Sequence, residues 1–299
     1  MKTKILAIFA CILWGSAFAG AKIGFEYTSP LHLSGMRFML AGILLIPLLI
    51  YQKTDWKANL KEWRYMLLFG VLQTFMQYGL FFMGLNLVPG AISAIIIGGG
   101  PLFVALMAHF TIANEPLTKR KTIAITLGMI GIVFTSLSKG GVDNINMTLY
   151  AGIGLLLLSN LIGASTNIIV AKNRSRVSPT MLTAFANFSG GLLLYIVSYF
   201  TEEWQTQAYT TEFYIALLWL AFIPAAGFTI WFGLLKNPKI KVSDLNIWKF
   251  ITPVTGVVLS WLLLPNEYPD IYSVIGVIII AFSLITLQWQ PAKKGIQQK

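Results

Sequence analysis

Residues 92–115 read ISAIIIGGGPLFVALMAHFTIANE, an apolar run with three consecutive glycines and Pro101 in its middle. Residues 243–267 read SDLNIWKFITPVTGVVLSWLLLPNE and repeat the pattern, with Pro253 aligned on Pro101. Each run is long enough to cross a bilayer, because about 20 apolar residues span the hydrocarbon layer. Proline removes a backbone donor and clashes with the preceding turn, so a kink or gap is expected in each helix. Paired interrupted helices of this kind indicate a carrier whose site lies near the middle of the membrane.

The two stretches also end alike, with Asn114-Glu115 aligned on Asn266-Glu267. A carboxylate at a membrane boundary, just before the next helix, caps that helix's free N–H groups and complements its dipole. Glu115 and Glu267 are therefore predicted to have a structural role. The residues predicted to act in gating are those at the breaks, namely Gly98, Gly100, Pro101 and Pro253, with the two prolines as hinges.

The composition restricts the chain to the class of integral membrane proteins. Of its 299 residues, 56% are hydrophobic and only 11% are charged, whereas soluble domains carry roughly 25% charged residues. The net charge of +11 does not indicate nucleic-acid binding, because the basic residues fall in the short gaps between apolar runs. With one cysteine, Cys11, and two histidines, His32 and His109, no disulfide, metal site or cofactor is expected.

Ten apolar runs follow one another and predict an all-α protein with ten transmembrane helices. They cover about residues 1–22, 30–51, 64–84, 89–112, 120–137, 149–171, 179–200, 213–235, 241–264 and 270–289. The first run imitates a cleavable secretory signal, with a basic start and small residues near its end. We expect it to be retained, because residues 153–171 repeat it later in the chain with Gly163 aligned on Gly15.

Lysine and arginine positions set the predicted orientation. Eighteen of the 22 fall in alternate segments that begin with the N-terminus, and basic residues stay on the cytoplasmic side. Both termini are therefore expected in the cytoplasm, in a multi-pass protein of the cytoplasmic (inner) membrane. Five helices per half is an odd number, so residues 1–140 and 141–299 are expected to form two halves of opposite orientation, an inverted-topology repeat.

The chain resembles the EamA branch of the drug/metabolite transporter superfamily over essentially its whole length. The matching marks are Trp14-Gly15-Ser16, Arg37 after Pro30, Pro101, Glu115-Pro116-Leu117-Thr118 with Gly128 and Gly131 following, Pro253, and Glu267 with Gly276. The resemblance implies a five-plus-five repeat whose first, third, fourth, sixth, eighth and ninth helices wall a cavity, and it does not specify a substrate. The second half departs from it, with Ala186 in place of Arg37 and Ile162 in place of Trp14.

Two basic residues lie inside predicted spans, where an ionisable group is costly unless it is paired or reaches water. Lys249 shares one helical face, polar or small throughout, with Asn246, Pro253, Gly256 and Ser260. Two interpretations fit Lys249: it snorkels to the cytoplasm, or it lines a cavity. Arg37 is expected to have a structural role, by snorkelling to the outer surface or by bonding neighbouring carbonyls.

Other helices carry polar or aromatic stripes as well. The predicted substrate-binding residues are Trp14, Gln73, Gln77, Tyr78, Asn160, Asn167, Trp231, Asn246 and Lys249. For any one of the stripes, packing between helices is the alternative, because small and amide side chains also hold membrane helices together.

The positions of the charged residues then favour a substrate class. No Asp or Glu lies deep in a predicted span, so the carboxylate site of proton- or sodium-coupled carriers is not expected. A lysine, together with the partial charges of interrupted helices, suits a substrate that carries a carboxylate. The sequence therefore predicts a secondary transporter of amino acids or related metabolites, working by alternating access in the direction of export. Its expected partners are the small-molecule substrate and membrane lipid, and a monomer is expected.

Three other functions compare less well with the same residues. Broad efflux of hydrophobic or cationic drugs is the alternative that the 13% aromatic content favours. An intramembrane enzyme would need an acid/base or metal constellation at one site, and we therefore expect the chain not to be an enzyme. A receptor or a channel fits the inverted repeat and the interrupted helices less well than a carrier does.

Overall fold

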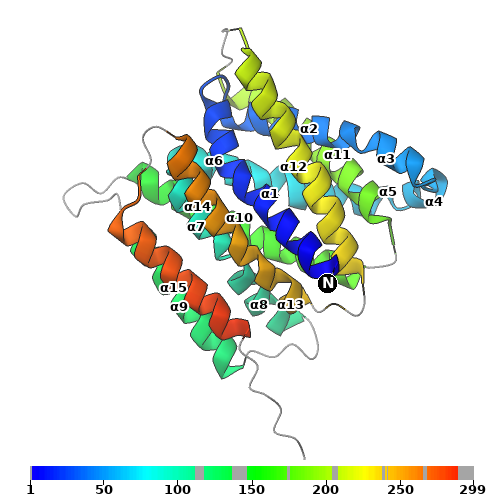
Figure 1. The fold of residues 1–299 in the computed structure, drawn as a ribbon. Helices are drawn as coiled ribbons and strands as arrows, with labels where there is room; N and C mark the ends of the chain where they lie inside the picture. Colours follow the sequence, from blue (N-terminus) through cyan, green and yellow to red (C-terminus); the bar gives the residue numbers. More distant parts are fainter. Residues whose placement is uncertain are drawn as a thin grey trace, which may run out of the picture.

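The computed structural model describes residues 2–111, 118–136, 147–173, 176–203, 208–237, 240, 242–264 and 268–288, and every regular element within these ranges is a helix (Figure 1). The elements of the first half are α1 (Lys2–Phe25), α2 (Pro30–Leu44), α3 (Ile46–Tyr51), α4 (Trp56–Leu60), α5 (Trp63–Gly70), η1 (Val71–Met76), α6 (Gln77–Leu87), α7 (Gly90–Gly98), α8 (Gly100–Thr111) and α9 (Lys119–Ser136). Those of the second half are α10 (Met147–Lys172), α11 (Pro179–Thr201), α12 (Thr211–Lys236), α13 (Val242–Asn246), η2 (Ile247–Phe250), α14 (Ile251–Leu263) and α15 (Ile271–Gln288).

Each predicted apolar run coincides with one helix or with consecutive helices, to within a few residues. Seven segments of the described chain are long and apolar enough to cross a membrane. Shorter apolar helices at Thr122–Gly131, Ile251–Leu263 and Ile271–Ser283 occupy the other three predicted runs. The chain is thus a multi-pass membrane protein, whereas the number of ten spans and the side on which each terminus lies stay predictions.

Local sequence explains where several helices begin. Ser29 precedes α2 and Ser178 precedes α11, and each serine is followed by a proline at the first helical position. Proline suits this position, because its missing N–H has no partner in the first turn anyway. The Ser178 hydroxyl accepts a hydrogen bond from the Met181 N–H at 3.2 Å, which caps the helix.

Two apolar runs contain a turn of another helix type, which was not predicted. The third apolar run contains a π-helical turn, η1, between α5 and α6, and the ninth contains a 3₁₀ turn, η2, between α13 and α14. Short π and 3₁₀ segments inside helices are often found at functional sites and hinges. Both turns carry predicted site residues, Gln73 in η1 and Lys249 in η2.

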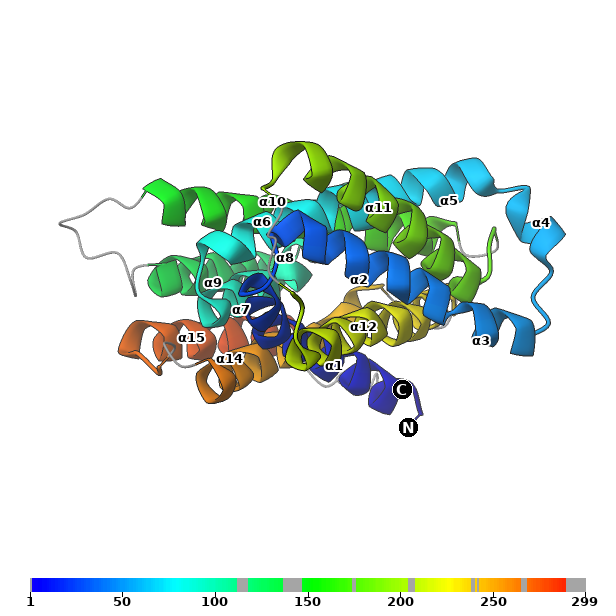
Figure 2. The same ribbon diagram turned by 90° about the horizontal axis from the view of Figure 1, so that it is seen from above.

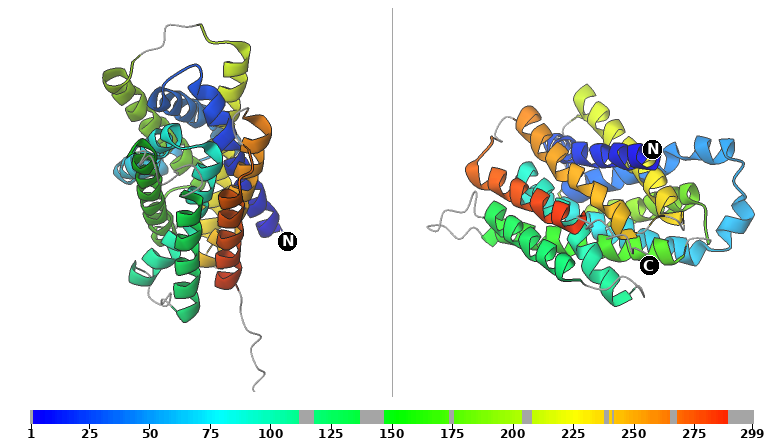
Figure 3. Two further views of the ribbon diagram at one scale, coloured as in Figure 1. Left: turned by 90° about the vertical axis from the view of Figure 1, so that its left-hand side faces the viewer. Right: turned by 60° about the horizontal axis from the view of Figure 1, so that its bottom comes forward.

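The helices of the two halves pack against one another in a regular scheme. α2 packs along α11, α7 along α14 and α9 along α15, while α1 contacts α12 and α6 contacts α10. Figures 1 and 2 show the α9–α15 pair at one edge of the bundle, with α3 and α4 at the opposite end. The side and bottom views agree on this arrangement (Figure 3).

The contact between α2 and α11, which we call the seam, is tied at both of its ends. The Glu202 carboxylate, just after α11, accepts hydrogen bonds from the Ser29 hydroxyl and from the Leu31 and His32 N–H groups at 2.6, 2.9 and 3.0 Å. At the other end, the Asn59 side chain accepts from the Ser178 N–H at 2.8 Å. The first turn of each seam helix is therefore held by the half to which it does not belong.

Candidate functional site

The two proline-marked breaks touch each other in the centre of the α7–α14 contact. α7 ends at Gly98 and α8 begins at Gly100, so the helix is interrupted at Gly99, as predicted. A Cβ atom at Gly98 would overlap the Pro253 ring, so only glycine allows the two segments to approach this closely. Pro101 and Pro253 both lie in the first turn after their break, where proline is tolerated. We call this region the break contact.

A cavity of about 100 Å³ lies beside the break contact and is walled by both halves. This volume holds several water molecules, because one water needs roughly 10–15 Å³ on the same measure. The lining residues come from α1, α2, η1, α6, α7 and α8 in the first half, and from α10, α12, η2 and α14 in the second. They are Trp14, Ala17, Phe18, Arg37, Gln73, Gln77, Tyr78, Phe81, Ile97, Gly100, Val104, Ser159, Asn160, Gly163, Ala164, Asn167, Phe228, Trp231, Lys249 and Thr252.

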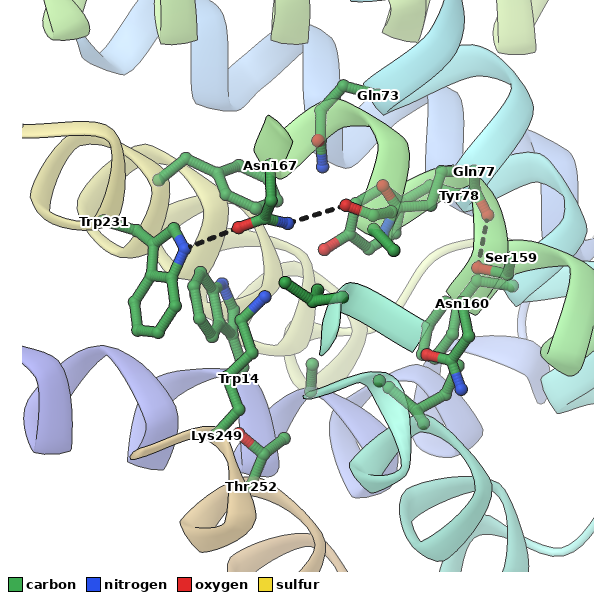
Figure 4. A pocket seen from close by; sticks show the side chains of 18 of the residues that line it. Trp14, Gln73, Gln77, Tyr78, Ser159, Asn160, Asn167, Trp231, Lys249 and Thr252 are labelled. Atoms are coloured by element: carbon green, nitrogen blue, oxygen red, sulfur yellow. Dashed lines mark hydrogen bonds between the residues drawn. The ribbon is translucent and has the colours of Figure 1, made fainter. Parts of the chain in front are cut away.

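Lys249 reaches this cavity from the 3₁₀ turn (Figure 4). Its Nζ lies 4.7 Å from the Trp231 ring centroid and 5.5 Å from the Trp14 ring centroid, so two indoles flank the ammonium group. Such cation–π contacts attract an ammonium by roughly 0.5–2 kcal/mol each. They do not neutralise it, and within the described chain no carboxylate pairs with Lys249. Of the two interpretations of Lys249, the geometry corresponds to a cavity lysine.

The two tryptophans are held in place by different contacts. Trp231 is 1% exposed, and its Nε1 donates to the Asn167 Oδ1 at 2.9 Å. The Asn167 Nδ2 in turn donates to the Gly163 carbonyl at 2.6 Å. Trp14 packs edge-on against Trp231 with ring centroids 5.0 Å apart, but its own buried Nε1 has no hydrogen-bond partner in the described chain. This wall therefore offers one rigid indole and one free N–H donor.

Acceptors lie across the cavity, on the π-helical turn and the helix that follows it (Figure 4). The buried Oε1 atoms of Gln73 and Gln77 both lack a hydrogen-bond partner among the described residues. The Ser159 hydroxyl donates to the Gln77 backbone carbonyl at 2.9 Å and so fastens α10 to α6. Buried polar atoms are normally satisfied, so unsatisfied atoms that line a cavity indicate that a ligand or water completes them.

Asn160 connects the cavity to the break. Its Nδ2 donates to the Ile96 carbonyl at 2.8 Å, in the last turn of α7. The same carbonyl accepts from the Gly99 N–H at 3.1 Å, so Asn160 is a second donor at the helix end. Asn160 therefore lines the cavity and also stabilises the end of α7. Its side chain thus contributes to helix packing as well as to the candidate site.

Arg37 also lines the cavity, and its surroundings correct the expectation of a snorkelling arginine. It is 1% exposed and therefore does not reach a surface. Its guanidinium carbon lies 4.6, 5.0 and 5.8 Å from the ring centroids of Phe38, Phe82 and Tyr78. Nε and Nη1 make no hydrogen bond to the described chain, so the arginine does not bond carbonyls through them either.

Most of the predicted substrate-binding residues are brought together by the fold. Trp14, Gln73, Gln77, Tyr78, Asn160, Asn167, Trp231 and Lys249 all line the cavity, and so does Gly100 from the gating group. Gly98, Pro101 and Pro253 lie at the break contact instead of in the lining. Glu115 and Glu267 fall outside the described residues.

Asn246 is the predicted substrate-binding residue that does not line the cavity. It is 1% exposed, and its Nδ2 donates to the Val242 carbonyl at 2.9 Å. Its side chain is thus engaged with its own helix, whereas Lys249, three residues later, reaches the cavity.

Sequence reasoning missed several lining residues, of which Ser159 and Thr252 are polar. Each is a single small hydroxyl residue in an apolar run, a pattern as typical of helix packing as of a site. Thr252 donates to the Cys11 carbonyl at 3.3 Å, across 241 residues of sequence. Phe18 and Phe81 were missed because an aromatic residue in a membrane helix carries no distinguishing signal.

Comparison with known proteins agrees with this architecture. The sequence profile of the EamA-like transporter family matches the chain twice, over residues 1–137 and over residues 150–288. "Uncharacterized transporter YvbV" of Bacillus subtilis is 26% identical over 95% of this chain and 90% of its own length. Protein PecM of Dickeya dadantii is 28% identical over 96% of this chain and 93% of its own.

Two further similarities concern a named transporter and a solved structure. The S-adenosylmethionine/S-adenosylhomocysteine transporter of Chlamydia trachomatis is 25% identical, over 94% of this chain and 89% of its own length. A solved crystal structure superposes with a TM-score of 0.73 at 16% identity and covers 96% of this chain and 98% of its own, which shows a shared fold. The family match extends over both halves, and the chain therefore belongs to the EamA-like transporter family of the drug/metabolite transporter superfamily.

Proposed function

We propose that this transporter moves small metabolites with a carboxylate group, amino acids among them, out of the cytoplasm across the cytoplasmic membrane. The observation that carries the proposal is the Lys249 ammonium, which faces the cavity between two indole rings without an acidic partner in the described chain. A charge held away from water needs a counter-charge. A substrate carboxylate supplies it, with the free Trp14 Nε1 as a second donor.

Alternating access between two pseudo-symmetric halves is the proposed mechanism. The helix pairing supports it. The pairs α2–α11, α7–α14 and α9–α15 each join a helix to its counterpart in the predicted repeat. The same repeat relates the α1–α12 pair to the α10–α6 pair. A twofold relation between the halves would produce this scheme. The break contact lies between the halves and next to the cavity, which suits a hinge at Pro101 and Pro253.

Two relatives support the substrate class. Transporters named for S-adenosylmethionine and S-adenosylhomocysteine are similar to this chain over most of both lengths. Both compounds carry an amino-acid carboxylate, which is the group that the cavity is proposed to bind. The names of the family and of these relatives describe transport rather than catalysis.

Efflux of cationic drugs is the competing proposal, and the aromatic walls favour it. Trp14, Trp231 and Phe228 would offer ring faces to an organic cation. Lys249 already lies over two of these rings, however, and Arg37 lines the same cavity. A cation without any anionic group would be repelled by these two fixed charges, so we favour a substrate that carries a carboxylate.

Counterflow in proteoliposomes tests the proposal, with a labelled amino-acid panel set against quaternary ammonium compounds. Uptake of an amino acid is expected, and Lys249→Gln should lower its apparent affinity about tenfold to a hundredfold, because a hydrogen bond to a charged group contributes roughly 1.5–3 kcal/mol. Lys172→Gln removes the same charge from the exposed end of α10 and should leave uptake unchanged. Equal transport of the cations, insensitive to Lys249→Gln, would refute the carboxylate site.

A further inference from the structure

Arg37 is the second charge of the cavity, and the proposed carboxylate does not account for it. Among the described residues, Arg37 and Lys249 are the charged ones that line the cavity, and no Asp or Glu of this part of the chain lies there with them. Two positive charges in one water-poor space repel each other and lack hydration. One carboxylate leaves the occupied cavity with one excess positive charge, whereas two anionic groups would neutralise it.

The surroundings of Arg37 resemble a prepared binding position. Three aromatic rings within 5.8 Å of its guanidinium carbon hold it by cation–π contact, yet Nε and Nη1 keep their hydrogen-bonding capacity. Each of these two nitrogens can donate a charge-assisted hydrogen bond to an oxygen of an anionic group. A buried arginine with a purely structural role would be expected to use these donors on backbone carbonyls.

The two cations lie at different ends of one aromatic wall. Lys249 lies over Trp14 and Trp231, whereas Arg37 lies over Tyr78. Phe228 separates the two ends, with its ring centroid 5.6 Å from Trp14 and 5.8 Å from Tyr78. Figure 4 likewise shows Lys249 and the tryptophans apart from Tyr78. The two cations thus contact different rings of this wall, and a short chain with an anionic group at each end could place one group beside each cation.

We infer that the cavity binds substrates with two anionic groups, with Lys249 holding one and Arg37 the other, so that the preferred class is small dicarboxylates, including acidic amino acids. This inference rests on the proposed function, because it adds a second anion position to the same cavity. It changes the role of Arg37 from structural to substrate-binding.

Matched pairs of ligands test whether the cavity has a second anion position beside the one at Lys249. Binding to the purified protein is measured for dicarboxylates of increasing length, from malonate to adipate, and for L-aspartate and L-glutamate, each beside its monoamide. The monoamide has nearly the same size but one charge fewer. We expect at least one dicarboxylate to bind about tenfold or more tightly than its monoamide, because a charge-assisted hydrogen-bonded pair is added. The chain length that binds best reports the separation of the two cations.

Variants then assign the charges. Arg37→Gln should remove the preference for the dicarboxylate and leave the affinity for the monoamide nearly unchanged, while Lys249→Gln should weaken both ligands. Arg176→Gln is the matched control, since Arg176 pairs with Glu62 at 3.2 Å, outside the cavity lining. Unchanged monoamide binding by Arg37→Gln also shows that this variant is folded. If Arg37→Gln does not fold, the comparison of each dicarboxylate with its monoamide on the unmodified protein still tests whether a second anion position exists.

The failures are distinguishable. Binding of monocarboxylates that depends on Lys249, with no preference for any dicarboxylate, overturns the second position and leaves the proposed function intact. Monocarboxylate binding that requires chloride also overturns the second position, because chloride then neutralises Arg37 in place of a second carboxylate. If no carboxylate binds, or if Lys249→Gln has no effect on any, the proposed function fails and this inference fails with it.

Discussion

The seam and the break contact each join one helix of the first half to its counterpart in the predicted repeat, yet the two contacts are built in opposite ways. At the seam, α2 and α11 are continuous and glycines bring their backbones together: a Cβ at Gly42 would lie 2.8–2.9 Å from backbone atoms of Ala184 and Phe188. At the break contact, α7–α8 and α13–α14 are interrupted, and glycine and proline meet. Continuous helices satisfy their own carbonyls and pack without gaps. At the interruption a side chain, Asn160, adds a hydrogen bond to the end of α7, and a cavity lies next to it.

The comparison suggests a division of labour for the proposed mechanism. The seam, tied at both ends by Glu202 and Asn59, suits a contact that stays intact during transport. The break contact suits one that changes, because backbone rotation at an interruption disturbs few regular hydrogen bonds. Substitutions that act on one contact and not on the other test this division.

The largest expected effect is at the seam. Gly42→Leu places a side chain where backbone atoms of α11 already lie within 2.9 Å of the missing Cβ, so the helices must separate. Overpacking typically costs about 1–3 kcal/mol, and backbone displacement along a whole helix exceeds that range, so we expect little folded protein. Gly233→Leu is the control, since no atom lies within 4 Å of its missing Cβ. Size-exclusion profiles and thermal unfolding in detergent compare the two, and equal stability would contradict close packing at the seam.

A smaller loss is expected at the end of the seam. Glu202→Gln removes the charge that accepts from two N–H groups and a hydroxyl at the start of α2. Hydrogen bonds to charged groups contribute roughly 1.5–3 kcal/mol, and the positive end of the helix dipole adds to this, so the unfolding temperature should fall. Asn59→Ala, at the uncharged opposite end, should have a weaker effect. A larger effect of Asn59→Ala would show that charge is not what holds this seam end.

The smallest effect on stability, but a clear one on transport, is expected at the break contact. Replacing Pro101 and Pro253 together by alanine restores two backbone donors and favours continuous helices, because alanine suits a helix interior and proline does not. The unfolding temperature should stay equal or rise, while the counterflow rate should fall about tenfold, equivalent to roughly 1.4 kcal/mol of barrier. An unchanged rate would argue against the hinge, and loss of folded protein would show that the prolines are structural.

Much of the fold follows from local sequence. The apolar runs predicted the helices within a few residues, and the break at Gly99 followed from three glycines and a proline in one run. The polar stripes predicted lining residues from several helices, because a helix that walls a cavity must present polar atoms on one face. Asn246 shows the limit: it was predicted on one polar face with Lys249, yet its amide bonds the Val242 carbonyl and only Lys249 lines the cavity.

By itself, the sequence determined that this is a membrane protein. It also determined at which residues the helices begin and end, and which side chains could form a polar site. Hydropathy and helical periodicity are properties of neighbouring residues, so they can be read along the chain. Only the tertiary structure decided that Arg37 joins Lys249 in one cavity, that Thr252 bonds the Cys11 carbonyl, and that Pro253 rests against Gly98. These contacts depend on which helix faces meet across long stretches of sequence, and that choice is made by the packing of the whole bundle.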